Sequence, residues 1–545
     1  MTAFQQLQLN TNQPADTHLE ILADGECGAN SGLVQFDMID QLIGQFRQRE
    51  FAIEATKEFF DNARNMGVIS YFIDGATLVY GSDTRPFIPS DEVAAKACLR
   101  VEFWNRLLNE TQIFEVMPTA KREKARAQFA GLDCPPFDET TVRPTMEDLL
   151  RQRGMFFSER VDGIFRGLSG DHVTNSPSGF AKKMIIANVL SDGYVTPHKG
   201  GLIGDLRGVV GRILGRGEPS EYGTRQLLGR LHRDYAGKKV AVDGGAFHIT
   251  IYKNGNAHFE VTPEVAVELN SVLANLYPSA IPSRFRTPAK KPKTGSFDLK
   301  MKRLPMGVID LLSNLDYRRD HYSLYTYSQS KEFIAQTVSV LEEIGGEISR
   351  SGDQSYIYVK FDFDARLVLD QLIFGGVIPE QASYQFYPTR SAIGEEAASR
   401  LDITPGRTYC EPSAGTGDLA QYLPVATTTC IELADVRAKV LVAKGYNTIK
   451  ADFLAWASEN SHVRFDGLLL NPPFSKGRAL AHLMAAASLC APHGRVVAIL
   501  PASMINTTPL IGFEHDWSGV YVDQFEGTPV RVVILTAQRA ARGGL

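Results

Sequence analysis

The chain has 545 residues, of which 44% are hydrophobic, 22% charged and 10% aromatic. This length exceeds what one hydrophobic core serves, and the composition is typical of folded proteins, so we expect several domains and exclude global disorder. The net charge of −5 conceals an asymmetry, because residues 121–303 carry 29 basic and 19 acidic side chains. A basic region of this kind favours a polyanionic partner.

Neither membrane insertion nor export is indicated. The sequence holds no run of eighteen apolar residues, and its start lacks the basic and apolar segments of a secretory signal. The six cysteines form no CxxC pair, and the histidines show no HxH or HExxH spacing. We therefore expect a cytoplasmic protein with mostly buried, reduced thiols, no membrane contact and no protein-held metal.

The N-terminal half is expected to be a flexible tail followed by a helical and α+β region. Residues 1–33 are polar and predicted to be flexible, and residues 34–278 form the first predicted domain. Within it, apolar residues at helical spacing predict long helices over residues 37–66 and 90–116, joined by a β-like insert at residues 68–80. This pattern is typical of a helical hairpin that serves as a scaffold.

Two further elements are predicted inside this domain. A helix should begin at Pro144, because proline suits the first helical position. Residues 247–261 predict a β-hairpin whose three-residue loop, Asn254–Asn256, places Ile251 opposite Phe259. This register puts apolar side chains opposite one another on one face.

A proline-rich basic linker at residues 279–304 separates this domain from a small α/β segment at residues 305–381. In that segment we predict a helix around residues 333–344 and a strand over residues 356–361. We expect duplex DNA to bind within residues 199–303, because clustered cations displace counterions from phosphates. The basic residues in the glycine-punctuated part of this stretch are Arg207, Arg212, Arg216, Arg225, Arg230, Arg233, Lys238 and Lys239.

Residues 382–545 carry a succession of predicted strand ends with distinctive side chains. Residues 407–420 predict a short strand, a glycine loop and the start of a helix, whose free N–H groups suit a nucleotide-like ligand. The next strand ends in Glu432, and an acid at this point of a Rossmann-like sheet binds a ribose diol. A third strand ends at Asp452 and Phe453, which suit the amine and the face of an adenine. This set favours adenosylmethionine over a dinucleotide, because the loop lacks the GxGxxG pattern.

The strongest signal is the tetrapeptide Asn471–Phe474, which follows the apolar strand Leu468–Leu470. The two prolines stiffen the loop and cannot continue the sheet. The Asn471 side-chain oxygen and the Pro472 carbonyl oxygen are therefore expected to be fixed acceptors at the strand end. Two such acceptors hold the hydrogens of a planar amine and turn its lone pair out of conjugation, while Phe474 stacks on the ring that carries the amine.

Residues 382–545 resemble the catalytic domain of N6-adenine DNA methyltransferases. The resemblance lies in the ordered motifs YQFYPT (384–389), EPSAGTG (411–417), Glu432, Asp452-Phe453 and NPPF (471–474), which is the gamma-class order. It implies an α/β fold, with a Rossmann-like methyltransferase domain dependent on S-adenosylmethionine at the C-terminus and a helical and α+β region before it. The implied catalytic residues are Asn471, Pro472, Pro473 and Phe474. The implied cofactor-binding residues are Tyr387, Thr389, Glu411, Pro412, Ser413, Gly415, Gly417, Glu432, Asp452 and Phe453.

The sequence after the NPPF motif and the N-terminal half of the chain each add to these expectations. The last strands of the sheet are expected at residues 494–501, 520–525 and 530–536, the final two as an antiparallel hairpin. Little sequence remains after the NPPF motif for a target-recognition domain, so that domain is expected to be missing or to lie upstream. Residues 99–275 resemble, more loosely, a domain of unknown function found in phage and plasmid proteins.

The predicted activity is methyl transfer from S-adenosylmethionine to adenine N6 in double-stranded DNA, with the target base flipped out of the stack. The reaction needs no cysteine nucleophile, and none lies beside the NPPF motif. No endonuclease motif is present, so we expect a stand-alone phage or plasmid enzyme, with or without site specificity. Two alternatives stay open: a methyltransferase acting on RNA or on a protein glutamine, and an idle nucleic-acid-binding or anti-restriction protein.

Overall fold

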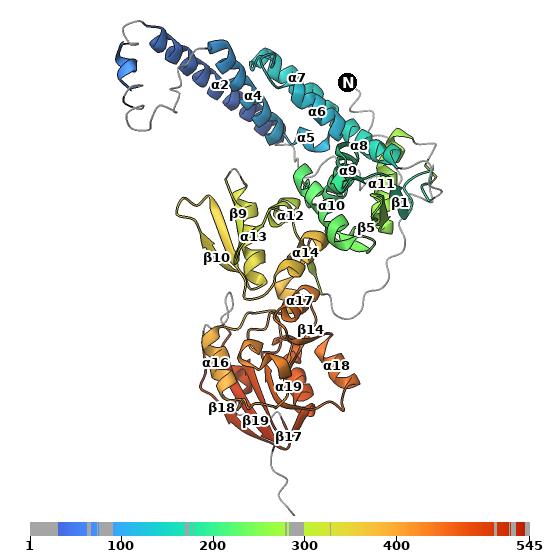
Figure 1. Ribbon diagram of the computed structural model, residues 1–545, viewed down its shortest axis with the longest axis vertical. Helices are drawn as coiled ribbons and strands as arrows, with labels where there is room; N and C mark the ends of the chain where they lie inside the picture. Colours follow the sequence, from blue (N-terminus) through green and yellow to red (C-terminus); the bar gives the residue numbers. More distant parts are fainter. Residues whose placement is uncertain are drawn as a thin grey trace, which may run out of the picture. The chain divides into compact units, whose positions relative to one another are not determined.

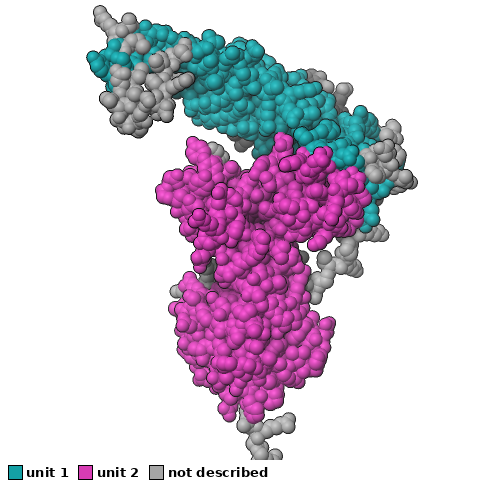
Figure 2. Space-filling view, in the orientation of Figure 1, with its two compact units in different colours: residues 1–189, 196–214, 263–288 teal, residues 190–195, 215–262, 289–545 magenta. Residues whose placement is uncertain are grey.

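In the computed structural model the chain forms two compact units (Figure 2). Unit 1 comprises residues 1–189, 196–214 and 263–288, and unit 2 comprises residues 190–195, 215–262 and 289–545. The structure describes residues 31–62, 67–72, 75, 91–168, 174–176, 178–277, 281–282, 299–327, 329–505, 510–522, 524 and 530–539. Most of the predicted tail and of the predicted linker lies outside these ranges, and the predicted domain boundaries stay predictions. None of the helices in the described ranges combines the length and apolar character that a membrane span requires.

Two long helices of unit 1 pack side by side (Figure 1), α2 (Ser31–Asp61) and α4 (Glu92–Glu110). Their contact buries aromatic rings, with the centroids of Phe46 and Phe103 5.5 Å apart. The pair matches the expected helical hairpin. The expected β-like insert is wrong where it is described, because residues 67–72 are helical. β-branched residues favour strands, but a helical turn satisfies its backbone groups without a neighbouring strand.

The helix predicted to begin at Pro144 begins earlier in the chain. Helix α7 runs over Glu139–Arg151, and Asp138 caps it by accepting a hydrogen bond from the Thr141 N–H at 2.9 Å. The aspartate cap outweighs the preference of proline for the first position, so Pro144 lies inside the helix. A separate helix, α8 (Arg153–Gly167), follows.

A buried ion pair ties together three further elements of unit 1. The remaining elements of this unit are α5 (Ile113–Val116), α6 (Thr119–Gln128), β1 (Lys183–Ile186), α9 (Pro197–Ile213) and α11 (Pro263–Leu276). Arg160 of α8 donates from Nε to Asp205 of α9 at 2.8 Å, and the Thr119 hydroxyl of α6 donates to the same carboxylate at 2.8 Å. A buried charge must be paired in this way, because an unpaired one is costly.

Unit 2 contains the predicted β-hairpin, in a register different from the predicted one. Its first elements are β2 (Leu190–Ser191), β3 (Tyr194–Val195), α10 (Glu221–Tyr235), β4 (Val240–Val242), η1 (Asp243–Gly245), β5 (Phe247–Ile251) and β6 (Ala257–Val261). Ile251 lies opposite Ala257, not Phe259. The Gly255 N–H donates to the Tyr252 carbonyl at 2.9 Å, and Gly255 has φ +81°. Glycine takes the last loop position, which is left-handed, so the loop starts one residue earlier than predicted. The register therefore shifts by two residues, and each side chain stays on its expected face of the hairpin.

The middle of unit 2 is an antiparallel sheet, in the order β10-β11-β9-β8, covered by helices. β7 and β12 pair with each other in a separate two-stranded sheet. The elements of this part of unit 2 are β7 (Met301–Arg303), α12 (Met306–Ser313), β8 (Asp316–Arg318), β9 (His321–Tyr325), α13 (Lys331–Glu343), β10 (Glu347–Arg350), β11 (Tyr356–Lys360), α14 (Arg366–Gly375) and β12 (Val377–Pro379). The helix and the strand predicted for this segment are confirmed as α13 and β11. We call residues 301–379 the middle segment.

The C-terminal sheet has seven strands in the order β15-β14-β13-β16-β17-β19-β18. The strands are β13 (Tyr409–Pro412), β14 (Thr428–Glu432), β15 (Asn447–Lys450), β16 (Phe465–Leu470), β17 (Cys490–Pro501), β18 (Phe513–Trp517) and β19 (Val532–Arg539). The first five are parallel, and β19 is antiparallel to β17 and β18. The helices are α15 (Gln381–Tyr384), α16 (Ser391–Ser399), α17 (Asp435–Ala443), α18 (Phe453–Glu459) and α19 (Arg478–Ser488).

Helices cover both faces of this sheet. Apolar residues of α16 pack on one face, and those of α18 and α19 pack on the other. The winding reverses between β13 and β16, and a sheet of this kind binds ligands at such a switch point. The predicted α/β class is confirmed for this part of the chain.

Two local predictions for the C-terminal sheet are wrong. The glycine loop leads into short 3-10 turns, η3 (Ala420–Tyr422) and η4 (Val425–Thr427), not into an α-helix, because Pro424 interrupts the segment. Where residues 520–525 are described, the expected strand is absent, because Tyr521 forms only an isolated bridge to Val532 and β18 pairs with β19 instead. Residues 523 and 525 lie outside the described ranges. An edge strand pairs on one side only, so apolar character is a poor guide to its position.

Among the described residues of the basic stretch expected to bind DNA, several basic side chains are buried or paired, and the DNA-binding role stays a prediction. Arg207 and Arg216 are only 1% and 3% exposed. Most of the others form ion pairs, namely Arg212 with Glu115, Arg225 with Glu221, Arg230 with Asp370, Arg233 with Asp234, and Lys239 with Glu260. These ion pairs offset positive charges that the composition alone would leave free to bind phosphates.

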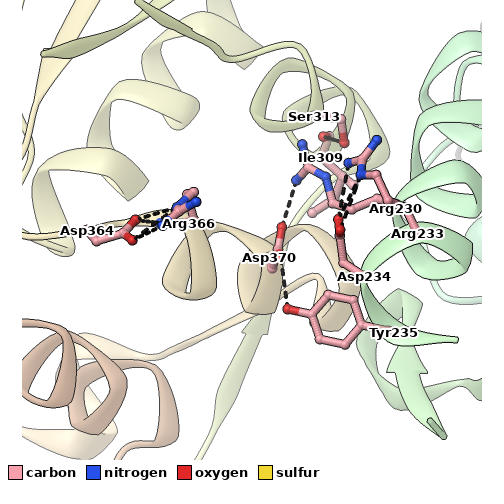
Figure 3. Close-up of polar contacts among 9 residues, drawn as sticks. All are labelled: Arg230, Arg233, Asp234, Tyr235, Ile309, Ser313, Asp364, Arg366 and Asp370. Atoms are coloured by element: carbon pink, nitrogen blue, oxygen red, sulfur yellow. Dashed lines mark hydrogen bonds and ion pairs between the residues drawn. The ribbon is translucent and has the colours of Figure 1, made fainter. Parts of the chain in front are cut away.

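One of these pairs attaches α10 to the middle segment (Figure 3). The Asp370 carboxylate of α14 accepts hydrogen bonds from Arg230 Nη1 at 2.9 Å and from the Tyr235 hydroxyl at 2.8 Å. The Tyr235 ring also packs edge-on against Phe374, with centroids 5.2 Å apart. Burial, followed by the Asp370 carboxylate, raises the pKa of the Tyr235 phenol, so the phenol stays protonated and continues to donate.

Replacing Asp370 by alanine should loosen α10. Two half-buried donors would lose their acceptor, at a cost of about 1 kcal/mol or more. Hydrogen exchange measured by mass spectrometry should then be faster over residues 221–235. Asp364→Ala is the matched control, because Asp364 pairs with Arg366 at the surface, where an ion pair contributes little. Equal exchange of α10 in the two variants would contradict the assignment.

Candidate active site

The carboxyl ends of β13, β14 and β16 open into a cavity of about 710 Å³ within unit 2. Parallel strands end at one edge of a sheet, so the motifs that follow them are brought together there. Twelve of the fourteen predicted site residues line the cavity, namely Tyr387, Thr389, Glu411, Ser413, Gly415, Glu432, Asp452, Phe453, Asn471, Pro472, Pro473 and Phe474. Pro412 and Gly417 do not line it. Pro412 is the buried last residue of β13, and Gly417 donates its N–H to the Ala414 carbonyl, which shapes the loop.

Glu432 fastens the glycine loop to the end of β14. Its carboxylate accepts hydrogen bonds from the Gly415 N–H at 2.8 Å and from the Ala434 N–H at 2.7 Å. Burial raises the pKa of this carboxyl, while the nearby Arg437 guanidinium and the backbone donors act to lower it. The two bonds leave further lone pairs on the carboxylate for a ligand.

Glycine is required at position 415 for two reasons. Its φ is +56°, a left-handed conformation that side chains rarely adopt. A Cβ at this position would also lie 2.5 Å from the Phe386 ring. The close approach places Phe386, which sequence reasoning did not select, beside the loop and in the cavity wall.

Two acids flank the glycine loop, Glu411 before it and Asp418 after it, and the buried Glu411 lacks full compensation. Glu411 is 3% exposed, and its Oε2 has no hydrogen-bond partner among the described residues. Burial, followed by the neighbouring Asp418 carboxylate, raises the pKa of Glu411 well above its usual range, against the effect of the Leu419 and Ala420 N–H groups. Burial also raises the pKa of Asp418. This corner of the cavity therefore favours a cationic hydrogen-bond donor.

Asn471 is held through a chain of polar contacts. Its Nδ2 donates to the Thr389 hydroxyl at 3.0 Å, and the Thr389 N–H donates to Asp418 at 2.7 Å. Because Nδ2 is used in this way, the Oδ1 atom is the end of the amide that can accept from a ligand. The contact also brings the YQFYPT and NPPF motifs together.

His482 of α19 connects Phe453, which follows β15, to the glycine loop. Its Nδ1 lies 3.2 Å from the Ser413 hydroxyl, and its ring lies 5.4 Å from the ring of Phe453, centroid to centroid. Burial lowers the pKa of His482 to about 4, so the imidazole is neutral at pH 7. Asp452 caps α18 by accepting from the Ala455 N–H at 3.0 Å, and its exposed carboxylate borders the cavity.

Sequence reasoning missed Phe386, Asp418, Arg437 and His482, all of which line the cavity. Asp418 directly follows the glycine loop and was within reach of the motif. Phe386 lies inside the YQFYPT motif and was also within reach. Arg437 and His482 depend on helix placement, so no local pattern identifies them.

The thiols in this region are unsuited to nucleophilic chemistry. Burial raises the pKa of Cys410 and Cys430, and it raises that of Cys490 to about 11. Four of the five cysteines in the described ranges are buried. Within the same ranges, no three His, Cys, Asp or Glu side chains gather as a metal site would require.

A family model for a domain of unknown function, DUF4942, matches residues 96–279. This is about a third of the chain and confirms the looser resemblance found at residues 99–275. The family description carries no activity. No curated protein matches the chain.

Several solved structures are similar to part of the chain. A proposed RNA methyltransferase from Pyrococcus horikoshii is 19% identical, covers 29% of this chain and 88% of its own, and has a TM-score of 0.24. Precorrin-6y C5,15-methyltransferase from Geobacter metallireducens is 15% identical, with 28% and 90% covered and a TM-score of 0.23. The 23S rRNA methyltransferase ErmE is 19% identical, with 29% and 72% covered and a TM-score of 0.25. At these TM-scores a function has to be inferred from the site residues.

Glu411→Gln should stabilise the ligand-free protein. A carboxyl whose pKa rises on folding destabilises the fold when ionised. This penalty starts to shrink as the pH falls below the raised pKa and is gone below the usual pKa of the carboxyl. Denaturant midpoints should therefore be higher for the variant at pH 8, and the difference should shrink toward acidic pH. The control Glu459→Gln removes an exposed carboxylate of α18 and should have little effect. A lower midpoint for Glu411→Gln at pH 8 would contradict the account of Glu411.

Proposed function

We propose that residues 382–545 transfer a methyl group from S-adenosylmethionine to N6 of adenine in DNA. One observation carries the proposal. The NPPF loop, Asn471–Phe474, lines the same cavity as the glycine loop and the acidic strand ends at Glu432 and Asp452. A methyl donor and an acceptor amine could therefore meet inside one pocket. The gamma-class order of the motifs supports adenine as the acceptor.

The donor set fits S-adenosylmethionine. Its methionine part carries an ammonium group, which can donate to the unpartnered Oε2 atom of the buried Glu411. Glu432 and Asp452 can accept from the ribose diol and the adenine edge, and Phe453 offers an apolar face. The cavity of about 710 Å³ lies in the range of small-molecule sites. Bound there, the sulfonium supplies an electrophilic methyl group.

The residues of the NPPF loop would act on the target amine. Asn471 Oδ1 and the Pro472 carbonyl oxygen would accept hydrogen bonds from its two N–H groups, which localises the lone pair on N6. Phe474 would stack on the adenine ring. Held by Glu411, Glu432 and Asp452, the cofactor would supply the methyl group that N6 takes up, and the electrons of the S–C bond would stay on sulfur. The proton released from N6 leaves to solvent. Positioning and electrostatics carry the catalysis, and no covalent intermediate is required.

Duplex DNA is the proposed substrate, and the target adenine must leave the stack to enter the cavity, at a cost of a few kcal/mol. RNA bases and a protein glutamine amide present similar planar amines. Transfer of tritiated methyl groups to plasmid DNA, ribosomal RNA and a glutamine-containing release factor, followed by nucleoside analysis, tests the proposal. Detection of N6-methyladenine in DNA alone supports it, and label only in RNA or protein overturns the DNA assignment.

Asn471→Ala should abolish methyl transfer and leave S-adenosylmethionine affinity nearly unchanged. Asn471 is proposed to contact the target amine and not the cofactor. Calorimetry and methyl transfer measured on the same preparation separate the two effects. Asn447→Ala is the matched control, because Asn447 also donates to a threonine hydroxyl but lies outside the cavity. Substantial methylation by Asn471→Ala would show that the NPPF loop is only a turn.

Glu432→Ala and Asp452→Ala should instead weaken S-adenosylmethionine binding. Each loses hydrogen bonds to the ribose or the adenine, at a cost of about 1–3 kcal/mol for the buried Glu432 and less for the exposed Asp452. Asp452→Ser keeps a residue able to cap α18 but too short to reach the adenine, so its loss of affinity cannot come from helix fraying. Wild-type affinity in these variants, measured by calorimetry, would remove both residues from the site.

A further inference from the structure

Arg437 is a buried cation that links the cavity to the middle segment. It lies on α17, is 2% exposed and lines the cavity. Its Nη2 donates to Oε1 of Glu343, the last residue of α13, at 3.1 Å. A side chain of the middle segment therefore contacts a residue of the cavity wall.

The flat face of Arg437 supports the aromatic part of the same wall. Its guanidinium carbon lies 3.8 Å from the centroid of the Phe386 ring and 5.7 Å from that of the Tyr384 ring. Contacts of this kind are attractive, and more so when water is excluded. Phe386 in turn lies against Gly415 of the glycine loop. Arg437 therefore holds the Phe386 ring in place, and the glycine loop packs against this ring.

The charge of Arg437 acts on Glu432 at the end of β14. Its guanidinium favours the ionised form of Glu432, which is the proposed acceptor for the ribose diol. Glu343 holds this cation in place, because a buried guanidinium without a counter-ion is costly. Rotation of Arg437 would remove both the support of Phe386 and the favourable field at Glu432.

Other contacts attach the middle segment to α17 without touching the cavity wall. Asp362, beyond β11, pairs with Lys444 at 3.4 Å, and Gln371 of α14 donates to Asp435. Neither Asp362 nor Gln371 lines the cavity. Attachment of the segment and support of the cavity can therefore be separated by substitution.

We propose that Glu343 is a positioning residue for the cofactor, acting through Arg437, and that the middle segment thereby sets S-adenosylmethionine affinity. The inference rests on the proposed function and adds a regulatory contact to that site. Displacement of α13 by a partner or ligand would weaken cofactor binding without touching the cavity.

The test compares Glu343→Gln with Asp362→Asn in the full chain. Both remove one negative charge from the middle segment and one ion pair to α17. Calorimetric S-adenosylmethionine affinity should fall about ten-fold or more in Glu343→Gln, as expected for loss of a charged hydrogen bond, and stay within two-fold of wild type in Asp362→Asn. Methyl transfer at saturating cofactor should be near normal in Glu343→Gln, with the loss confined to KM for the cofactor. Glu343→Asp, which keeps the charge, should recover part of the affinity.

Each outcome decides a different point. Absence of cofactor binding by the wild-type protein would overturn the proposed function itself. Wild-type binding with unchanged affinity in Glu343→Gln, or equal losses in Glu343→Gln and Asp362→Asn, would overturn the positioning role alone. If Glu343→Gln folds poorly, the shift in melting temperature on adding cofactor to Glu343→Asp and Arg437→Lys gives the same decision. Arg437→Lys keeps a cation but loses the planar contact with Phe386, so a wild-type shift in both variants would contradict the proposal.

Discussion

Burial of carboxyl groups where β13 and β14 end is the constraint around which the C-terminal part of unit 2 is arranged. Glu411, Asp418 and Glu432 all lie in surroundings that raise their pKa. Removing charge from water is costly, so each oxygen must find donors or wait for a ligand. The tight loop at Gly415, the backbone donors and the Arg437 guanidinium all serve this need. The arrangement trades stability of the empty protein for readiness to bind a cation.

The sequence predicted which strand ends carry the site residues, because each of these strands ends in a distinctive side chain. Glu432 is the last residue of β14 and Asn471 directly follows the apolar end of β16, so the parallel topology brings both to one edge of the sheet. His482 and Arg437 gave no such signal, since their roles depend on how helices pack. The β5–β6 register failed for a related reason, because a shift of two residues leaves the alternation of faces unchanged.

The net charge of a segment says less about its surface than its apolar pattern says about its fold. The excess of basic residues in the middle of the chain suggested a phosphate-binding surface. In the fold, Arg230 meets Asp370, which lies far away in sequence, and Arg216 is buried. Composition cannot detect pairing of this kind, because it depends on tertiary contacts between distant segments. A basic segment is informative only once its counter-ions are known.

The contacts between the middle segment and α17 have a practical consequence for dissecting this protein. A fragment cut at residue 382 keeps every strand of the C-terminal sheet but loses Glu343, Asp362 and Gln371 from the surface of α17. The face of α17 that packs against α14 would meet water, and a guanidinium shielded in the intact chain would become hydrated. Such a fragment invites aggregation and a misshapen pocket. The smallest piece worth purifying starts no later than β7, at Met301.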